Sequence, residues 1–262
     1  MEAAPIRWRL ATFARDTGEE IDYRAIEAPL DGFATAVRSF IAADGKGCNV
    51  TAPFKLEALA LADEQRPNAA MAGAANCLKF ESDRIIAENF DGIGLVNDIQ
   101  RNLGYMIAGK SVLFLGAGGA TRGAILPFME AGPASITVVN RTVSKVMDLK
   151  AAFSSFGELN ACGYEDLSGE PFDLVLNATS ASLFGDLPPL PVSVFAAGTL
   201  AYELAYGKGL TPFLKLARAH GAERLVDGVG MLVEQAAEAF EWWRGVRPDT
   251  TPMIDALTIP LE

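Results

Sequence analysis

The sequence predicts an α/β protein of two domains with a cleft between them, and three observations support this fold class. The chain has 262 residues, enough for two ordinary domains. Between residues 110 and 220, short apolar segments of strand length alternate with helical segments, as in parallel βαβ units. The first half also mixes helices and strands, but it contains two neighbouring strands joined by a polar turn. The two halves are therefore expected to form different domains.

Apolar spacing and the positions of proline and glycine predict the individual elements. In the first half we expect helices at 6–14, 33–43 and 53–64 and strands at 21–27, 48–52, 77–80 and 84–88. In the second half we expect helices at 92–103, 142–153 and 211–220, and one that follows the GAGGATRG segment and ends at residue 130. We expect strands at 110–115, 136–139, 172–176 and 199–204.

The tail contains a long amphipathic helix, Met231 to Trp243, whose apolar stripe needs a partner. We expect this helix to pack back on the first domain. The smaller α/β domain is therefore assigned to residues 1–91 and 228–262, and the second domain to residues 92–227.

Composition excludes several classes of protein. Half of the residues are hydrophobic and 21% are charged, which is typical of a globular protein. The net charge of −11 argues against a nucleic-acid partner. The N-terminus lacks the apolar region of a secretory signal, and no apolar run is long enough to cross a bilayer. We expect a cytoplasmic protein without a membrane partner, either a monomer or a homodimer.

Metal binding is not expected. The only histidine, His220, comes just before a glycine at a predicted helix end, where it is expected to be a capping residue. The three cysteines, Cys48, Cys77 and Cys162, form no CxxC pair and are expected to be free thiols. The sequence therefore lacks the His and Cys clusters of structural metal sites.

The segment SVLFLGAGGATRGAILPF has the pattern of strand, glycine turn and helix that binds dinucleotides. Gly116 permits the tight turn, while Gly118 and Gly119 let the backbone approach a pyrophosphate at the helix N-terminus. The third glycine of the usual motif is replaced by Thr121, so an ordinary tight turn is the alternative interpretation. We predict a Rossmann-like domain with a cofactor-binding turn formed by Gly116, Ala117, Gly118, Gly119 and Ala120.

The end of the next predicted strand favours NADP over NAD. NAD enzymes place a carboxylate there for the ribose 2′-hydroxyl. This chain has Asn140, Arg141 and Thr142 instead, followed by Lys145. Arg141 can bind a 2′-phosphate as a planar fork, and Lys145 adds positive charge. The alternative is a pair of solvated surface cations.

The complete set of motifs resembles one family. GAGGATRG is followed by VVNRT, by NATS at 177–180 and by DGVGMLVEQAA at 227–237, and NVTAPFK, AGAANCL and ENFDGIG precede them. In this order they are similar to the motifs of the shikimate dehydrogenase family, from about Phe13 to about Pro252. The resemblance implies an NADP-dependent oxidoreductase that reversibly reduces a small molecule, 3-dehydroshikimate, to shikimate in chorismate and aromatic amino-acid biosynthesis.

Lys55 and Asp91 are the predicted catalytic pair. Lys55 lies in the first turn of the helix expected from Pro53, where the helix dipole disfavours a cation and lowers the pKa of the ammonium. Without the resemblance, the alternative is that Lys55 is a surface lysine whose charge is offset by Glu57. Asp91 precedes a predicted helix and is expected to be its N-cap. The resemblance implies that Asp91 lies beside Lys55, which exchanges a proton with the substrate oxygen.

The resemblance implies further site residues, in two groups. Thr51, Asn76 and Gln235 would bind substrate hydroxyls, and Tyr206 would stand at the mouth of the cleft. Thr179 and Gly228 would border the nicotinamide. Without the resemblance, Asn76 could instead be a residue that caps a loop, and Gln235 could be a solvated helix residue.

The sequence departs from the family at its start. The family opens with a strand and a Ser-x-Ser-Pro segment that holds the substrate carboxylate, where this chain has AAPIRWR. Arg7 or Arg9 could replace the serines, and helical spacing directs at most one of them into the cleft. Phe90 and Glu203 also differ from the threonine and aspartate usual there. Two alternatives therefore stay open: a paralogue acting on quinate or a related polyol acid, and an NADP-binding protein with little turnover.

Overall fold

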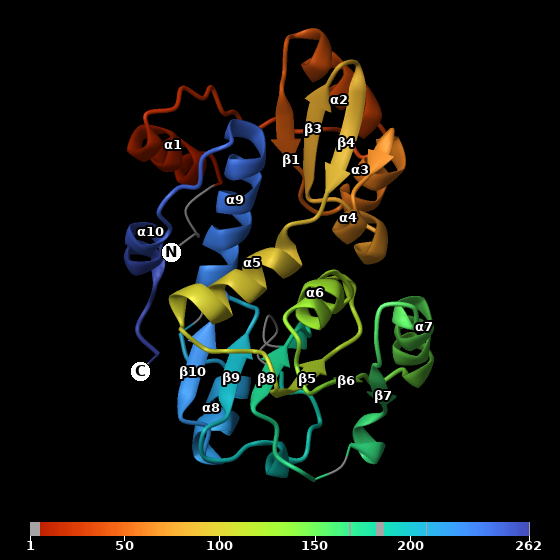
Figure 1. The fold of residues 1–262 in the computed structure, drawn as a ribbon, viewed down its shortest axis with the longest axis vertical. Coiled ribbons are helices and arrows are strands. Elements are labelled where there is room, and N and C mark those ends of the chain that lie inside the picture. Colours follow the sequence, from red (N-terminus) through yellow and green to blue (C-terminus); the bar gives the residue numbers. More distant parts are fainter. Residues whose placement is uncertain (1–5, 168, 182–185, 208, 262) are drawn as a thin grey trace.

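The computed structural model describes residues 6–167, 169–181, 186–207 and 209–261. Two β-sheets lie one above the other along the long axis, with helix α5 (Asp91–Asn97) between them (Figure 1). The smaller sheet belongs to the first half of the chain and the larger sheet to the second half. The expected α/β architecture with two sheet-containing parts is thus confirmed.

The larger sheet has six parallel strands in the order β10-β9-β8-β5-β6-β7. Its strands are β5 (Ser111–Leu115), β6 (Ser135–Val139), β7 (Asn160–Cys162), β8 (Leu174–Asn177), β9 (Leu200–Glu203) and β10 (Arg224–Asp227). If the six strands are numbered 1 to 6 in chain order, their order across the sheet is 6-5-4-1-2-3. This is the doubly wound Rossmann arrangement. The short strands β7 and β10 were not among the expected elements.

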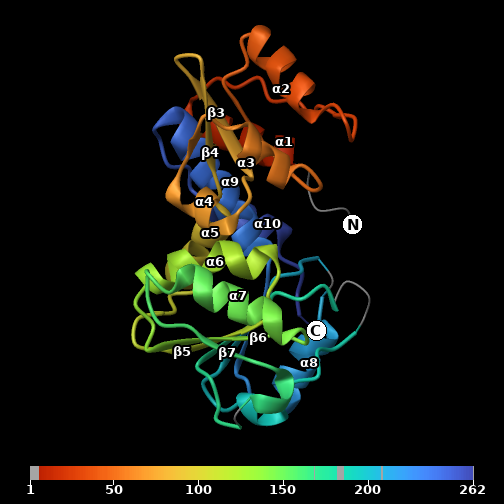
Figure 2. The ribbon, with the colours of Figure 1, turned by 90° about the vertical axis from the view of Figure 1, so that its right-hand side faces the viewer.

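Helices cover both faces of this sheet (Figure 2). They are α6 (Gly119–Glu130), α7 (Val143–Phe153) and α8 (Pro212–Ala219). Alternate residues of β5 face opposite ways: Phe114 packs on Phe128 of α6, with ring centroids 4.9 Å apart, while Leu115 joins the cluster around Phe213 of α8. Burial on both faces explains why β5 reads as a continuous apolar run.

The smaller sheet has the order β1-β3-β4-β2. Its strands are β1 (Gly47–Asn49), β2 (Glu64–Gln65), β3 (Cys77–Glu81) and β4 (Arg84–Glu88), and its helices are α2 (Phe33–Ala42), α3 (Lys55–Leu61) and α4 (Pro67–Ala72). Phe33 and Val37 of α2 pack with Leu78 of β3 and Ala87 of β4 in one buried cluster. This small core holds α3, and with it Lys55, beside the sheet.

Two expectations for this part were wrong. Residues 21–27 form no strand within the described chain, although their apolar and polar residues alternate. A strand exists only where a neighbouring edge supplies hydrogen bonds, and alternation shows only that one face is buried. The helix expected at 53–64 ends at Leu61, because Glu64 and Gln65 instead pair with Ile86 and Ala87 of β4.

Helix α9 (Val229–Arg244) packs on α1 (Ile6–Thr17) and α10 (Thr251–Leu257). Leu10 and Phe13 of α1 contact the buried stripe of α9, and the rings of Phe13 and Phe240 meet edge to face. At its far end, the indole of Trp243 donates a hydrogen bond to the Leu78 carbonyl, 3.1 Å away. The expected domain boundaries stay a prediction.

Helix α5 fits between α6 and α9 because it carries glycine at the contacts. A Cβ on Gly92 would lie 2.2 Å from the Gly123 carbonyl oxygen of α6, and one on Gly94 would lie 2.7 Å from the Gln235 nitrogen of α9. After Asn97 the helix widens into a π-helical turn, in which the Leu103 amide donates to the Asp98 carbonyl. The sequence had indicated one continuous helix there.

A membrane-spanning helix needs about 20 consecutive apolar residues. Among the helices that the structure describes, none is long and apolar enough to cross a membrane.

Replacing Gly92 by alanine should destabilise the protein, because the new methyl group has no room between α5 and α6. Overpacking of this kind costs about 1–3 kcal/mol of unfolding free energy, which guanidinium unfolding would measure. Gly118→Ala is the matched control, since a Cβ there meets nothing within 4 Å. Equal stabilities for the two variants would contradict the tight α5–α6 contact.

Candidate active site

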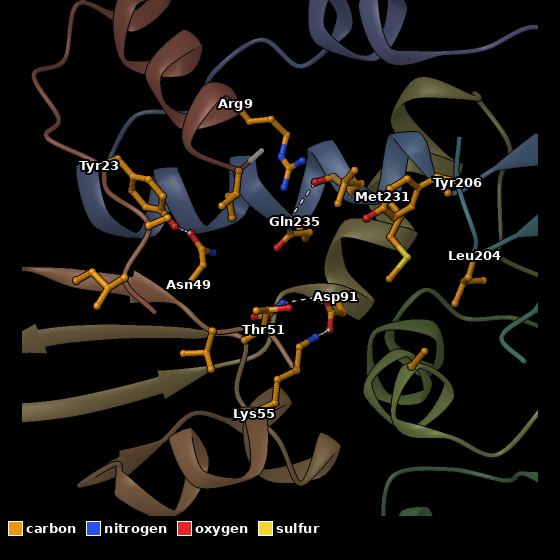
Figure 3. A pocket seen from close by; sticks show the side chains of 18 of the residues that line it. Arg9, Tyr23, Asn49, Thr51, Lys55, Asp91, Leu204, Tyr206, Met231 and Gln235 are labelled. Atoms are coloured by element: carbon orange, nitrogen blue, oxygen red, sulfur yellow. Dashed lines mark hydrogen bonds and ion pairs between the residues drawn. The ribbon is translucent and has the colours of Figure 1, made fainter. Parts of the chain in front are cut away.

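A cavity of about 550 Å³ lies between the small sheet, α9 and the first turn of α6 (Figure 3). Eight of the residues expected at the site line it: Thr51, Lys55, Asn76, Asp91, Ala120, Tyr206, Gly228 and Gln235. They come from α3, α5, α6, α9 and the loops between them, so residues almost 200 positions apart in the chain meet here. All four of the predicted substrate-binding residues are within this set.

Lys55 and Asp91 form the ionic centre of the cavity. The Lys55 ammonium donates a hydrogen bond to Asp91 Oδ2 at 2.7 Å. Their side chains are 34% and 22% exposed, so the pair is partly shielded but open to a small molecule. Lys55 is the first residue of α3 and Asp91 is the first residue of α5. The Lys55 carbonyl also accepts a hydrogen bond from the Ala75 amide, 2.9 Å away. The lysine is therefore held at both its backbone and its side chain.

Asn76 holds the other side of Asp91. Its amide Nδ2 donates to Asp91 Oδ1 at 2.7 Å, while its Oδ1 accepts from the Phe90 amide at 2.9 Å. Asn76 is only 3% exposed. The expectation that Asp91 is an N-cap was wrong, because its carboxylate accepts from the Lys55 and Asn76 side chains and its residue already belongs to α5. Two charge-assisted bonds orient this carboxylate more firmly than one cap bond would.

The other expected substrate residues surround this centre. Gln235 is 8% exposed and its amide donates to the Leu232 carbonyl at 3.1 Å, so it is not a solvated helix residue. Tyr206 is 39% exposed at the edge of the cavity, and Thr51 is exposed as well. Their predicted contacts with a substrate stay predictions.

Sequence reasoning missed a second pair in the cavity wall. The Tyr23 hydroxyl donates to Asn49 Oδ1 at 2.9 Å, and burial raises the pKa of this tyrosine. Asn49 was detectable in principle, because it lies two residues before Thr51 and extended residues two apart share a face. Arg9, one of the two arginines considered from the sequence, also lines the cavity. The side chain of Arg7 lies outside the described part of the structure.

A second cavity, of about 590 Å³, lies at the carboxyl edge of the larger sheet. Its lining includes Gly116, Ala117, Gly118, Asn140, Arg141, Lys145 and Thr179 from the expected cofactor site. These residues follow β5, β6 and β8, whose carboxyl ends meet at the same edge. Gly116 has a φ of +98°, which a residue with a side chain rarely adopts.

The glycine turn leaves space for a phosphate. A Cβ on Gly118 would meet nothing within 4 Å, and α6 begins at the next residue with its N-terminus at this turn. Backbone amides at a helix N-terminus attract anions. Gly119 begins α6 and Thr142 directly precedes α7, but neither is among the described lining of these two cavities. Their predicted cofactor contacts stay predictions.

Tyr164 is a lining residue of the second cavity that the sequence analysis did not identify. Burial raises its pKa to about 12, and the positive charge of Arg141 acts in the opposite direction, so the two side chains are close. Tyr164 follows β7, a strand that was not expected, and for this reason its place at the carboxyl edge was not recognisable. Asp186, in the segment between β8 and β9, lines the same cavity.

The two cavities flank one turn of the chain. Gly116 to Gly118 line the second cavity, and Ala120, two residues further on, lines the first. Gly116, Gly118 and Ala120 would therefore hold a nucleotide next to the cavity that contains Lys55, where it would supply the hydride. A Rossmann-like sheet, an anion-binding turn and an adjoining lysine–aspartate pair together define a two-domain, nucleotide-dependent oxidoreductase.

Comparison with known proteins gives the family. The shikimate dehydrogenase substrate-binding domain matches residues 8–78, the shikimate/quinate 5-dehydrogenase domain matches 98–184, and the shikimate 5′-dehydrogenase C-terminal domain matches 228–258. A shikimate dehydrogenase (NADP(+)) of Nitrosospira multiformis is 54% identical over 94% of this chain and 90% of its own length. The chain belongs to the shikimate dehydrogenase family.

Solved structures show the same fold. The crystal structure of an Ael1 enzyme from Pseudomonas putida is 56% identical, with a TM-score of 0.95 over 98% of this chain and 94% of that one. A 5-ketofructose reductase of a Gluconobacter species is 31% identical, with a TM-score of 0.83 over 98% and 95% of the two chains. The fold is thus shared with proteins of different names, one of which is named for 5-ketofructose.

Asn76→Ala should destabilise the folded protein, because it leaves the buried Phe90 amide without its acceptor and removes one donor from Asp91. An unsatisfied buried polar group costs about 1–3 kcal/mol, which chemical unfolding would detect. Thr51→Ala, in the same cavity wall but exposed, should change the unfolding free energy by less than about 0.5 kcal/mol. Similar losses for both variants would show that the Asn76 bonds contribute nothing specific.

Proposed function

We propose that this protein is an NADP-dependent shikimate dehydrogenase, which reversibly reduces 3-dehydroshikimate to shikimate in chorismate and aromatic amino-acid biosynthesis. The observation that carries the proposal is the 2.7 Å hydrogen bond between Lys55 and Asp91, in a cavity next to the glycine turn after β5. The relatives named shikimate dehydrogenase (NADP(+)), at about half identity over most of the chain, support the same activity.

NADP fits the second cavity. The open space at Gly118 and the N-terminus of α6 suit a pyrophosphate, while Arg141 and Lys145 supply two cations where the 2′-phosphate of NADP would lie. Among the described residues, the end of β6 carries no acidic side chain that would repel this phosphate. When bound, the reduced cofactor supplies the hydride.

Lys55 is the proton donor in the proposed reaction. Its ammonium hydrogen-bonds the ketone oxygen and gives up a proton as that oxygen becomes a hydroxyl, and in the reverse direction its amine accepts the hydroxyl proton. Asp91 keeps the lysine in place through the 2.7 Å contact. Asn76 orients Asp91 from the other side, and Thr51, Tyr206 and Gln235 are placed to bind substrate hydroxyls.

We further propose a small-molecule substrate rather than a nucleic-acid or membrane partner, a cytoplasmic location, and either a monomer or a homodimer. Quinate or another polyol acid is the second candidate substrate, because the name of one matching family domain includes quinate.

Lys55→Ala should lower kcat for shikimate oxidation about 10²- to 10⁴-fold, because the reacting oxygen loses its proton-transfer partner. NADPH affinity should be nearly unchanged, since Lys55 lines only the first of the two cavities. Steady-state absorbance at varied shikimate and fluorescence titration of NADPH measure the two quantities. Lys46→Ala, which removes an exposed lysine of the same domain, is the control. A Lys55→Ala enzyme with the kcat of the unmodified protein would exclude this role.

Arg141→Ala should weaken NADPH binding by about 1.5–3 kcal/mol while leaving NADH binding almost unchanged, because only NADPH carries the 2′-phosphate. Titration of both cofactors against the folded protein measures this difference. Lys150→Ala removes an exposed cation from α7, the helix that follows Arg141, at a position outside the cavity lining, and should affect neither cofactor. Equal losses for NADPH and NADH would mean that Arg141 is a structural residue.

A further inference from the structure

A buried carboxylate lies against the first turn of α9, outside both site cavities. Asp98 is only 2% exposed and begins the π-helical turn Asp98–Asn102 that follows α5. Among the described residues, its two hydrogen-bond donors are both neutral. The Tyr202 hydroxyl lies 2.7 Å from Asp98 Oδ2, and the Asn102 amide lies 2.9 Å from Oδ1. Burial raises the pKa of Asp98, because the charged form loses its hydration. Burying a carboxylate without a cation is costly, so its contacts must contribute to the fold or to the site.

The first turn of α9 is in backbone contact with Asp98. A Cβ on Gly230 would lie 1.9 Å from Asp98 Oδ1, so only glycine fits at this position. On another side of the same turn, a Cβ on Gly228 would lie 2.2 Å from the Leu204 carbonyl oxygen. The amides of a helix N-terminus lack partners within the helix and carry positive potential, which suits a carboxylate beside them. The turn is thus held closely between Asp98 and the segment after β9.

Tyr202 connects Asp98 to one of these amides. Its side chain is fully buried in β9, and its hydroxyl oxygen accepts from the Met231 amide at 3.3 Å. A tyrosine hydroxyl has one proton to donate and can also accept. Because this proton is donated to Asp98, the accepting side of the oxygen faces Met231. Met231 is the third residue of α9, where the helix itself supplies no acceptor. Asp98 therefore orients the group that caps α9.

The capped turn forms one side of the first cavity. Gly228 and Met231 line this cavity together with Ala120, which follows the glycine turn in α6. Figure 3 shows Met231 near Leu204, across the cavity from Tyr23. A shift of the first turn of α9 would therefore change the side of the cavity that adjoins the second cavity, and leave the side with Tyr23 in place.

We propose that Asp98 and Tyr202 are positioning residues, which act through the Met231 amide to hold the first turn of α9 where the two cavities adjoin. Neither residue is among the lining of the two cavities, so each acts through α9. The inference rests on the proposed function for the reaction. Hydride transfer needs close alignment of the two reactants, and a misplacement of about 1 Å can slow a reaction about 100-fold. Loss of the pair should slow the transfer step more than it weakens binding.

Tyr202→Phe removes the hydroxyl and keeps the ring. In rapid-mixing experiments on the full chain, a single turnover of 3-dehydroshikimate with saturating NADPH should have a rate constant about 10- to 100-fold lower, with its full amplitude. The affinity for NADPH and the KM for 3-dehydroshikimate should change by less than about 3-fold. A purely structural role would instead lower the amplitude, because fewer molecules would be folded, and leave the rate constant unchanged.

Tyr105→Phe is the matched control. It removes a hydroxyl that donates to the Asp173 carbonyl at 2.8 Å, just before β8 and therefore at the opposite end of the same sheet. The rate constant for transfer should stay that of the unmodified protein. Equal losses in Tyr105→Phe and Tyr202→Phe would show that any missing tyrosine hydroxyl has this effect, and the inference would be wrong.

Two variants of Asp98 test whether it acts through Tyr202. Asp98→Ala leaves the Tyr202 hydroxyl without a fixed direction and should slow the transfer step by a similar factor. The double variant should be no slower than the slower single variant, because both changes break the same connection. Asp98→Asn keeps an oxygen acceptor for Tyr202 and should recover part of the rate. Losses that multiply in the double variant would mean that the two residues act independently, contrary to the inference.

Amide hydrogen exchange, followed by NMR, tests the same contact without turnover. Tyr202→Phe should speed the exchange of the Met231 amide by at least about 10-fold, with the amide of Phe240 further along α9 unchanged. If the unmodified protein has no turnover, the proposed function fails, and faster exchange confined to the first turn of α9 still supports the inference. If turnover is found and Tyr202→Phe keeps its transfer rate, the inference is wrong and the proposed function stands. Unchanged exchange at Met231 overturns the inference in either case.

Discussion

The close packing of α5 against α6 and α9 is the constraint on which the arrangement of the site depends. Gly92 and Gly94 allow this short helix to approach both neighbours at distances that no side chain would permit. Asp91 is its first residue, so the packing sets where the carboxylate stands relative to Lys55 on one side and to the first turn of α6 on the other. The distance between the acid–base pair and the nucleotide turn is therefore fixed by backbone contact rather than by flexible side chains.

The electrostatics follow from this arrangement. Although the chain is acidic as a whole, Arg9 and Lys55 line the first cavity, and Arg141 and Lys145 line the second. Positive charge in a cavity favours the binding of an anionic group of a small molecule. In the first cavity Asp91 offsets part of this charge, and its carboxylate accepts hydrogen bonds from both Lys55 and Asn76.

Local patterns allowed much of the fold and site to be predicted, and their failures have a common cause. The glycine turn after β5 and the residues after β6 were recognisable because strand, turn and helix are adjacent in the sequence. Residues 21–27 alternate like a strand but have no pairing edge among the described residues, and pairing is not a local property. The strands β7 (NAC) and β10 (RLVD) lack the run of three apolar residues that is present in β5, β8 and β9, and because β7 was not expected, the place of Tyr164 was missed.

The sequence by itself determined the order of elements, the phosphate-binding turn and the chemical types available at the site, because these depend on neighbouring residues. Only the tertiary structure decided what those residues do to one another. Asp91 accepts from Lys55 and Asn76 instead of capping its helix, and Arg9, one of the two arginines considered from the sequence, is buried in the wall of the same cavity. These outcomes depend on α1, α3, α5 and α9 meeting in space, and contacts between residues so far apart in the chain have no signal in local spacing.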